Sequence, residues 1–295
     1  MKVFVFGLGF SGLAFARAAL AAGWEVAGTH REPETHPDDK IRYITFGPDH
    51  PLPKDAMSGV IGLLSTVPPT EKGDPVLDAL RNDINIMERF AWIGYLSTTG
   101  VYGDRQGGLV DETSPLLPSQ ARSQLRVRAE EEWLSLWHNY KRPVHIFRLA
   151  GIYGPGRSAI EQIRAGRARR ILKPGQLFSR IHVEDISGAL LASLAKPTPG
   201  EVYNLCDDDP AAPDEVISYA ADLLGAPPPP AIPFEQAELS EMARSFYADN
   251  KRVSNQKIKT VLGYRMRYPS YREGLRAILS AESGSASPGA DAPSA

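Results

Sequence analysis

Three glycines at fixed spacing stand near the start of the chain, between a short apolar run and an alanine-rich stretch. Gly7, Gly9 and Gly12 follow residues 3–6 and open the stretch 11–22. In a strand–turn–helix unit, the first glycine permits a tight turn, the second admits a phosphate, and the third lets the helix approach the strand. The helix N-terminus adds free N–H groups and a partial positive charge. The pattern predicts a dinucleotide pyrophosphate site formed by Gly7, Gly9, Phe10, Ser11 and Gly12.

The end of the second apolar run indicates which dinucleotide would bind. A carboxylate about 20 residues after the glycines would hold the ribose hydroxyls of NAD. Here the run ends in Thr29, His30 and Arg31, so the acid is replaced and a cation follows. This favours NADP, with Arg31 on the 2′-phosphate and NAD as the alternative. Two other interpretations stay open: Glu32 or Glu34 turns back to the ribose, or Arg31 is a solvated surface residue.

A later apolar run ends in small and polar residues. Ser65, Thr66, Val67 and Pro68 close the run that starts at position 60. Dinucleotides lie across the carboxyl edge of a parallel sheet. We therefore expect these four residues to line the cofactor.

Strand-length apolar runs alternate with helical patterns over the first half of the chain. Buried parallel strands joined by helices give such an alternation. The predicted fold is α/β, a Rossmann-type doubly wound parallel sheet with a smaller C-terminal substrate lobe. Strands are expected at 3–6, 24–29, 60–67, 92–97, 144–149 and 201–205, and helices at 11–22, 75–89 and 124–137.

The pattern becomes less regular after residue 150. We assign residues 1–150 and 182–205 to the dinucleotide-binding domain, and 151–181 and 206–282 to the substrate lobe. Residues 283–295 are almost entirely Ser, Gly, Ala, Pro and Asp, which predicts a disordered tail.

Composition narrows the function classes. The formal net charge is −2, so the whole chain has no charge excess that favours nucleic acid or an anionic membrane. No apolar stretch approaches the roughly 20 residues that a membrane span needs. The single cysteine, Cys206, excludes an internal disulfide, and no Cys/His spacing suggests a metal site. We expect a cytoplasmic protein, monomeric or homodimeric, with no metal, nucleic-acid or membrane partner.

Several ordered motifs together resemble a known family. They are LSTTGVYG at 96–103, VDET at 110–113, RLAGIYGPG at 148–156, IHVED at 181–185, KRVSN at 251–255, LGY at 262–264 and YPSYREG at 268–274. With the glycine turn, they make the chain similar to the extended branch of the short-chain dehydrogenase/reductase superfamily, which includes sugar-nucleotide epimerases and dehydratases. The resemblance spans nearly the whole ordered chain. It implies a nicotinamide cofactor, a small-molecule substrate and an active-site hydroxyl at Thr98.

The same resemblance exposes a departure at the catalytic pair. The family uses a YxxxK pair, in which the tyrosine transfers the proton and the lysine lowers its pKa and holds the ribose. Arg122 stands at the tyrosine position and Arg126 at the lysine position. An arginine stays protonated at working pH and cannot exchange a proton usefully. The candidate catalytic residues are therefore Thr98, Arg122 and Arg126, without the standard mechanism. For Thr98, a strand-end role on the backbone is the alternative; for Arg126, a solvated helix-face charge.

Two arginines near the sheet are candidates for an anionic substrate, namely Arg148 and Arg180. The basic run 164–170 is instead interpreted as a solvated helix face. His182 is expected to be structural, beside a helix that Asp185 caps. Tyr102 is considered as a substitute acid, although packing is its expected role.

Two functions compete at this point. The first is an NADP-dependent oxidoreductase, epimerase or dehydratase-like enzyme with a non-standard proton donor. The second is a non-catalytic sensor or regulator that binds NADP(H) without turnover. A third, weaker interpretation is a fold retained without any ligand. Fold alone cannot decide among them.

Overall fold

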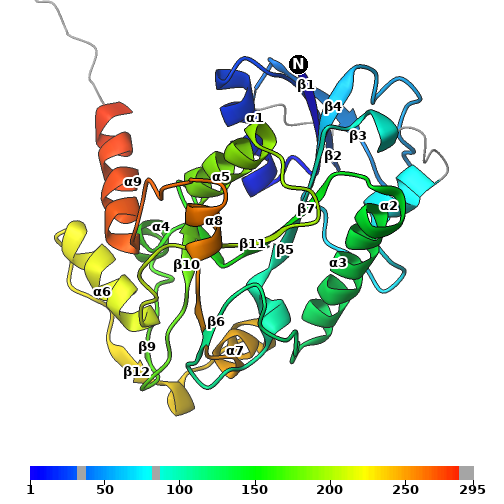
Figure 1. Cartoon of the computed structure of the whole chain (residues 1–295). Coiled ribbons are helices and arrows are strands. Elements are labelled where there is room, and N and C mark those ends of the chain that lie inside the picture. Colours follow the sequence, from blue (N-terminus) through cyan, green and yellow to red (C-terminus); the bar gives the residue numbers. More distant parts are fainter. Residues whose placement is uncertain (32–37, 82–86, 286–295) are drawn as a thin grey trace, which may run out of the picture.

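The computed structural model describes residues 1–31, 38–81 and 87–285, with side chains as far as residue 282 in the last segment. Its centre is a seven-stranded parallel sheet (Figure 1). The spatial order is β11-β7-β5-β4-β1-β2-β3. The strands are β1 (Lys2–Phe6), β2 (Glu25–His30), β3 (Ile41–Thr45), β4 (Val60–Ser65), β5 (Trp92–Thr98), β7 (Val144–Leu149) and β11 (Val202–Leu205).

The strand order reverses between the neighbouring strands β1 and β4. The glycine turn follows the carboxyl end of β1 and therefore lies beside the carboxyl end of β4. Such a reversal opens a crevice at the carboxyl edge of a doubly wound sheet, where ligands bind. The predicted Rossmann-type parallel sheet is thus confirmed. The strand β3 was not predicted, because only two of its five residues, Ile41 and Ile44, are buried and they do not alternate.

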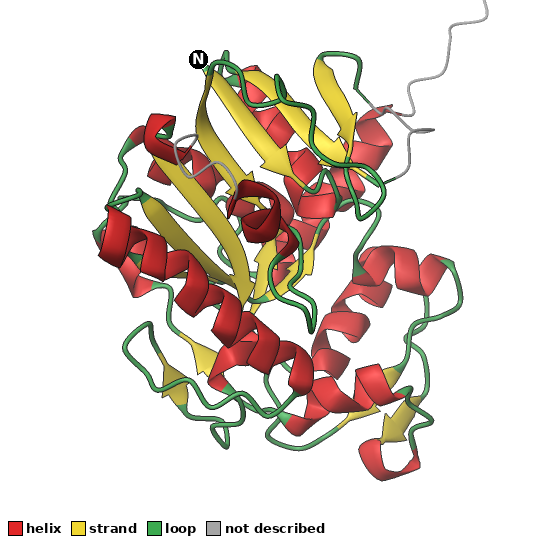
Figure 2. Ribbon diagram, turned by 90° about the vertical axis from the view of Figure 1, so that its right-hand side faces the viewer, coloured by secondary structure: helices red, strands yellow, loops and turns green. Residues whose placement is uncertain are grey.

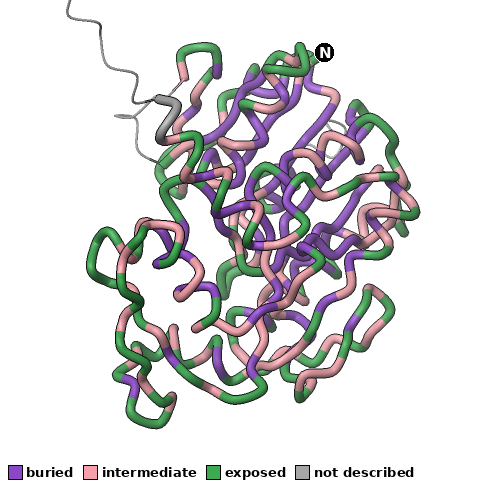
Figure 3. Tube along the Cα trace, turned by 90° about the vertical axis from the view of Figure 1, so that its left-hand side faces the viewer, coloured by how far each residue is buried: buried purple, intermediate pink, exposed green. Residues whose placement is uncertain are grey.

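Helices cover both faces of the sheet. On one face, α1 (Phe10–Ala21) and α5 (Val183–Ala195) bury Phe15 and Leu190 against Trp92 and Phe147. On the other, α2 (Pro75–Leu80) and α3 (Ala121–Tyr140) bury Leu77 and Trp133. Because both faces are covered, the strands inside the sheet are buried along almost their whole length, whereas the edge strand β3 is only partly buried (Figure 3). Of the helix predicted at 75–89, the described part ends at Leu80, and residues 82–86 lie outside the description.

Most of the remaining elements build the lobe at the carboxyl edge (Figure 2). Its own core joins Ile160, Ile217 and Leu275. Its strands pair in parallel twos: β8 (Gly151–Tyr153) with β10 (Arg180–His182), and β9 (Arg170–Leu172) with β12 (Ala231–Pro233). Its helices are α4 (Ala159–Arg164), α6 (Pro213–Leu223), α7 (Glu241–Ala248) and α9 (Tyr271–Ser285).

One segment that the sequence placed in the lobe packs on the sheet domain. This segment contains β13 (Arg252–Val253), which pairs with β6 (Leu109–Val110), and α8 (Gln256–Thr260). Val253 of β13 and Ile258 of α8 join the core around α1 and α5. The domain assignment otherwise stays a prediction. The predicted tail needs one correction: α9 continues to Ser285, and residues 286–295 lie outside the description.

Candidate functional site

The glycine turn has the geometry that its spacing predicts. Gly7 has φ +90°, in the left-handed region that favours glycine. A Cβ on Gly12 would lie 2.1 Å from the carbonyl oxygen of Gly7, so the helix can approach the strand only with glycine there. A Cβ on Gly9 would meet nothing within 4 Å. Gly9 is exposed, so the chain itself does not fill the space above it.

Neighbouring strands hold this turn in place. The Thr29 hydroxyl accepts a hydrogen bond from the Gly7 N–H at 2.9 Å, and the Thr66 hydroxyl donates to the Gly7 carbonyl oxygen at 2.6 Å. The turn is therefore tied to both β2 and β4. Gly9 caps α1 without a side-chain hydrogen bond, and the first turn of α1, which includes Phe10 and Ser11, carries no acidic residue. The N-terminal donors of α1 are thus left for an anion.

The other predicted cofactor residues lie at the same edge. Ser65 ends β4, with its hydroxyl buried and without a partner among the described residues, and Val67 and Pro68 follow. His30 ends β2 with its ring 6.3 Å from that of Tyr43. Arg31 is exposed. Glu32 and Glu34, the alternative ribose ligands, lie outside the described residues.

A cavity of about 800 Å³ connects this edge to the lobe. Thr98 and Pro68 line it from the sheet side, and the lobe supplies the opposite wall. The charged side chains of the cavity wall are mostly cationic. Among the described residues, the cationic side chains of the wall outnumber the acidic ones, and its carboxylate, on Asp249, is paired with Lys251 at 3.4 Å. The cations are Arg122, Arg126, Arg157, Arg169, Arg180 and Lys251.

Thr98 lies at the carboxyl end of β5, where it caps a short 3-10 turn (Thr99–Tyr102). Its hydroxyl oxygen accepts a hydrogen bond from the Gly100 N–H at 3.1 Å. This is the backbone role that the sequence left as the alternative. The hydroxyl is half-buried and lines the cavity, so its proton can still be donated to a bound molecule.

Comparisons with known proteins agree with this architecture. The sequence profile of the NAD dependent epimerase/dehydratase family matches residues 74–206. Protein YeeZ of Escherichia coli K12 is 31% identical over 289 residues, covering 91% of this chain and 96% of YeeZ. The chain belongs to the NAD dependent epimerase/dehydratase family.

Solved structures extend the comparison. A functionally unknown conserved protein from Silicibacter pomeroyi is 47% identical, with a TM-score of 0.88 over 95% of this chain and 98% of that one. The UDP-glucuronic acid 4-epimerase from Bacillus cereus, solved in complex with NAD, has a TM-score of 0.75 over 97% of this chain and all of that one. At 18% identity, it shows a shared fold.

Within this epimerase/dehydratase framework, the two arginines of α3 do not form a proton-transfer pair. Arg126 turns back to β5, where it donates to the Tyr95 hydroxyl at 2.9 Å and to the Leu96 carbonyl oxygen at 2.7 Å. Arg122 turns the other way, to α7. It donates to the Ser245 hydroxyl at 3.0 Å, and its guanidinium lies 4.4 Å from the centre of the Phe246 ring.

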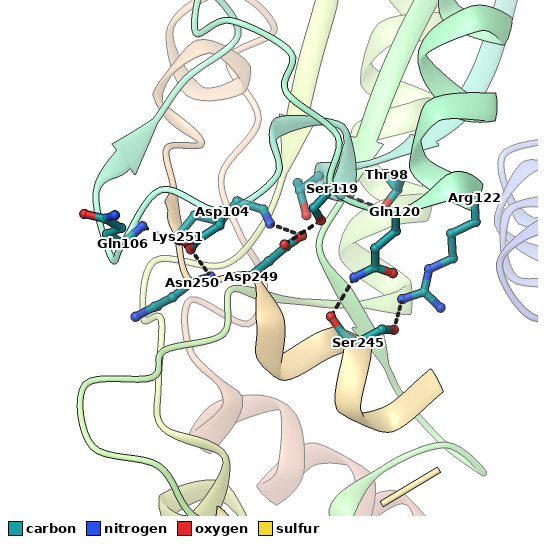
Figure 4. Close-up of polar contacts among 12 residues, drawn as sticks. Thr98, Asp104, Gln106, Ser119, Gln120, Arg122, Ser245, Asp249, Asn250 and Lys251 are labelled. Atoms are coloured by element: carbon teal, nitrogen blue, oxygen red, sulfur yellow. Dashed lines mark hydrogen bonds and ion pairs between the residues drawn. The ribbon is translucent and has the colours of Figure 1, made fainter. Parts of the chain in front are cut away.

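These contacts hold α7 against the cavity. Figure 4 shows Gln120 and Arg122 reaching from the start of α3 to Ser245. The Gln120 amide donates to the Ser245 carbonyl oxygen at 2.6 Å, and the Ser119 hydroxyl donates to Asp249 at 2.7 Å. Ser245 and Asp249 line the cavity, so these bonds fix part of its wall. The partners are about 120 to 130 residues apart, and no sequence pattern links them.

Replacing Arg122 with alanine should loosen α7. One hydrogen bond and one exposed cation–π contact would be lost, together worth about 1 kcal/mol. We expect amide hydrogen exchange in α7 to become about five times faster. The measurement is hydrogen exchange read by mass spectrometry, with Arg128→Ala as control, since Arg128 is on the exposed side of the same helix. Equal exchange in both variants would show that Arg122 does not hold α7.

The structure corrects the expectation for Arg148. This side chain is 4% exposed and is not part of the cavity wall. It forms a buried ion pair with Glu130 of α3, at 2.7 Å from Nη2 and 3.1 Å from Nε. Its charge is already compensated, so it is not a substrate-binding residue.

Tyr102 belongs to the same buried cluster. Its hydroxyl donates to Asn204 at 2.7 Å and accepts from Arg148 at 2.9 Å. Burial raises the pKa of Tyr102 to about 12. A phenol held inside the core with that pKa does not serve as the missing acid, in agreement with a packing role.

The strand-to-helix junction at His182 also differs from expectation. His182 itself caps α5, accepting a hydrogen bond from the Glu184 N–H at 3.2 Å. Asp185 instead accepts from the Tyr264 hydroxyl and the backbone N–H groups of Arg267 and Tyr268. Burial lowers the pKa of His182 to about 4, which keeps the ring neutral as a structural residue requires.

Among the residues that the structure describes, no cluster of three or more His, Cys, Asp or Glu side chains could hold a metal ion. None of the helices within these ranges is long and apolar enough to span a membrane. In the basic run, Arg164 pairs with Glu282 at 2.6 Å and Arg167 is exposed, whereas Arg169 reaches the cavity wall.

Proposed function

We propose that this chain is an NADP-dependent oxidoreductase of the epimerase/dehydratase type that acts on a small anionic molecule without the standard Tyr/Lys pair. The observation that carries the proposal is the continuous cavity, which places Thr98 and several arginines between the carboxyl edge of the sheet and the lobe. An arginine-rich wall suits a carboxylate- or phosphate-bearing substrate.

The residues present fit a dinucleotide. Gly9 leaves open space above the uncapped N-terminus of α1, where the pyrophosphate would bind. Arg31 would contact the 2′-phosphate of NADP. Thr29, His30, Ser65, Thr66, Val67 and Pro68 would line the nucleotide along the strand ends. The cofactor would supply the hydride acceptor or donor.

The remaining roles follow from chemistry. Thr98 would donate a hydrogen bond to the reacting oxygen of the substrate. Arg122 and Arg126 would stabilise negative charge on the substrate or hold a phosphate, since guanidinium groups stay protonated. The proton itself would come from water or from the substrate. Nucleotide sugars are reasonable first candidates, because the related MoeE5 was solved with UDP-glucuronic acid and NAD.

A non-catalytic NADP(H) sensor is the second candidate. It is favoured by the contacts of Arg126 and Arg122, which are committed to β5 and α7 rather than to each other. The two functions are separated by incubating the chain and NADP(H) with a panel of sugar nucleotides, ketones and hydroxy acids. Cofactor absorbance at about 340 nm reports net oxidation or reduction, and NMR of the recovered substrate reports epimerisation or dehydration, in which the hydride returns to the substrate. Turnover with any of them excludes the sensor. NADP(H) binding without turnover, together with a change in assembly or partner binding, excludes the enzyme.

The cofactor preference can be tested at Arg31. We expect Arg31→Ala to weaken NADPH binding by roughly 10- to 100-fold, because one charge-assisted contact to the 2′-phosphate is worth about 1.5–3 kcal/mol. NADH binding should not change. The measurement is calorimetric titration with NADP, NADPH, NAD and NADH. Arg89→Ala is the control, because Arg89 is equally exposed on the same domain.

Each possible result has a definite meaning. Tighter binding of NAD(H) than NADP(H) would overturn the NADP assignment and leave the family chemistry in place. Failure of all four dinucleotides to bind would mean that the glycine turn is only architectural, and the proposed function would fall.

A further inference from the structure

Arg180 is a cation of the cavity wall that lacks a direct ion pair among the described residues. It starts β10, lines the cavity, and donates from Nη1 to the carbonyl oxygens of Phe178 and Ala211, both at 2.9 Å. Among the described residues, no carboxylate forms an ion pair with it. Burial lowers the pKa of Arg180, but an arginine remains protonated at neutral pH. A half-buried charge without a counter-ion is costly, and this one lines the cavity where a ligand would bind.

The nearest candidate for a counter-charge does not supply it. Asp207 donates its backbone N–H to the Arg180 carbonyl oxygen at 2.7 Å, yet both of its carboxyl oxygens are buried without a hydrogen-bond partner among the described residues. Burial raises the pKa of Asp207 to about 8, although Arg180 opposes the shift. Among the described residues, Asp207 therefore forms no hydrogen bond or ion pair with the Arg180 side chain.

A second feature at the same place favours an anion. The helix α6 begins at Pro213, which also lines the cavity, and its N-cap Ala212 has no side chain that could cap the helix. The residue before this N-cap, Ala211, accepts a hydrogen bond from Arg180. The positive end of the helix thus lies beside the guanidinium. The acidic residues of its first turn, Asp214 and Glu215, are not part of the cavity wall.

The surroundings of Arg180 distinguish a carboxylate from a diphosphate. The cavity near Arg180 is lined by apolar and aromatic residues, among them Tyr153, Ile217, Tyr271 and Leu275. Most other donors of the lobe have hydrogen-bond partners, and Arg157 packs over the Phe10 ring, 5.5 Å from its centre. Glu161 accepts the N–H groups of Gly156 and Ser158 at the start of α4, and Lys173 and Arg169 donate to backbone carbonyl oxygens. The Nε and Nη2 groups of Arg180, for which the described residues supply no acceptor, form a fork that matches a carboxylate in shape and charge.

We propose that Arg180 binds the carboxylate of a substrate with an apolar body, at the lobe end of the cavity. This inference rests on the proposed function, since it names the substrate class of the same cavity. Thr98 and Leu149 are register partners, as are Gly151 and Arg180. Two strand spacings and two residues therefore separate Thr98 from Arg180, a backbone distance of roughly 12 Å. One small molecule can reach both side chains.

The test is calorimetric titration of the full chain, with and without NADPH. The probes are hexanoate and 3-phenylpropionate, their neutral amides, inorganic phosphate and UDP. We expect both carboxylates to bind at least ten times more tightly than their amides, and Arg180→Gln to remove this difference. Arg180→Lys should retain the charge but lose most of the affinity, because it lacks the fork. Arg167→Gln, an exposed arginine of the same lobe, is the control.

Thermal unfolding separates binding from a structural role. If Arg180 only ties β10 to the segment before α6, Arg180→Gln would lower the melting temperature and leave carboxylate binding unchanged relative to the amides. Equal binding of carboxylates and amides by the wild-type chain would also overturn the inference, as would tighter binding of phosphate or UDP. NADPH binding on the same samples tells the two proposals apart. If NADPH binds and the carboxylates do not, only the substrate class is wrong; if NADPH does not bind, the proposed function fails by itself.

Discussion

Replacing Gly9 with alanine should abolish tight NADP(H) binding while leaving the fold intact. A Cβ at this position meets no protein atom within 4 Å and projects into the open space above the start of α1. The pyrophosphate would occupy that space, so the methyl group would push it away from the helix N-terminus. We expect at least about a 100-fold loss of affinity, equivalent to about 2.7 kcal/mol. The free energy of unfolding should change by no more than about 1 kcal/mol.

Gly12→Ala is the matched comparison, because it adds the same methyl group one helical turn away. Its Cβ would lie 2.1 Å from the Gly7 carbonyl oxygen, so the turn itself must move. We expect this variant to lose about 3 kcal/mol of stability as well as cofactor affinity. Calorimetric titration and denaturant unfolding of both variants give the comparison. Normal NADP(H) binding by Gly9→Ala would place the pyrophosphate elsewhere.

Local patterns predicted the geometry of the glycine turn. The glycine spacing concerns neighbours in one turn, so the sequence itself carries the information. The anchoring of that turn by Thr66 was less visible. Its hydroxyl bonds Gly7 across 59 residues, and only the pairing of β1 with β4 brings the two together. The sequence placed Thr66 at the correct edge and did not reveal its partner.

The arginines show where sequence reasoning ends. The sequence makes Arg148 and Arg180 equal candidates, because both lie near the sheet. Their roles differ because of single partners elsewhere in the chain. Glu130 forms an ion pair with Arg148 from the buried face of α3, whereas the Arg180 guanidinium donates to backbone carbonyl oxygens. Whether an arginine is paired depends on packing, and the spacing of residues does not encode it.

The contacts of Arg122 and Arg126 likewise depend on packing that the sequence does not encode. Spacing indicated that Arg122 and Arg126 lie one turn apart at the start of α3, and they do. The direction of each side chain depends on what surrounds it. The Leu96 carbonyl oxygen attracts one guanidinium, and Ser245 with Phe246 attracts the other. A pair at the right spacing can therefore serve two unrelated purposes.

Breaking the buried ion pair of Arg148 and Glu130 should lower the free energy of unfolding of the sheet domain strongly. Glu130 is 2% exposed, accepts hydrogen bonds from Arg148, and accepts another from the Ser97 hydroxyl at 2.5 Å. Glu130→Ala would leave the Arg148 charge buried beside Tyr102 without its counter-ion. Removing one partner of a buried pair costs about 3–5 kcal/mol, which is a large part of the stability of a typical domain. The loss should appear as a lower midpoint in urea or guanidinium unfolding.

The double variant Glu130→Ala/Arg148→Met shows why the single change costs so much. If the uncompensated charge is the cause, removing Arg148 as well should recover more than half of the lost stability, because the apolar side chain needs no counter-ion. The recovery would be incomplete, since Ser97 and Tyr102 also lose a partner. If the double variant were less stable than Glu130→Ala, packing or the hydroxyl hydrogen bonds would dominate instead. A cost below about 1 kcal/mol for Glu130→Ala would mean that water reaches Arg148, and the arginine would then regain its place among the candidates for an anionic substrate.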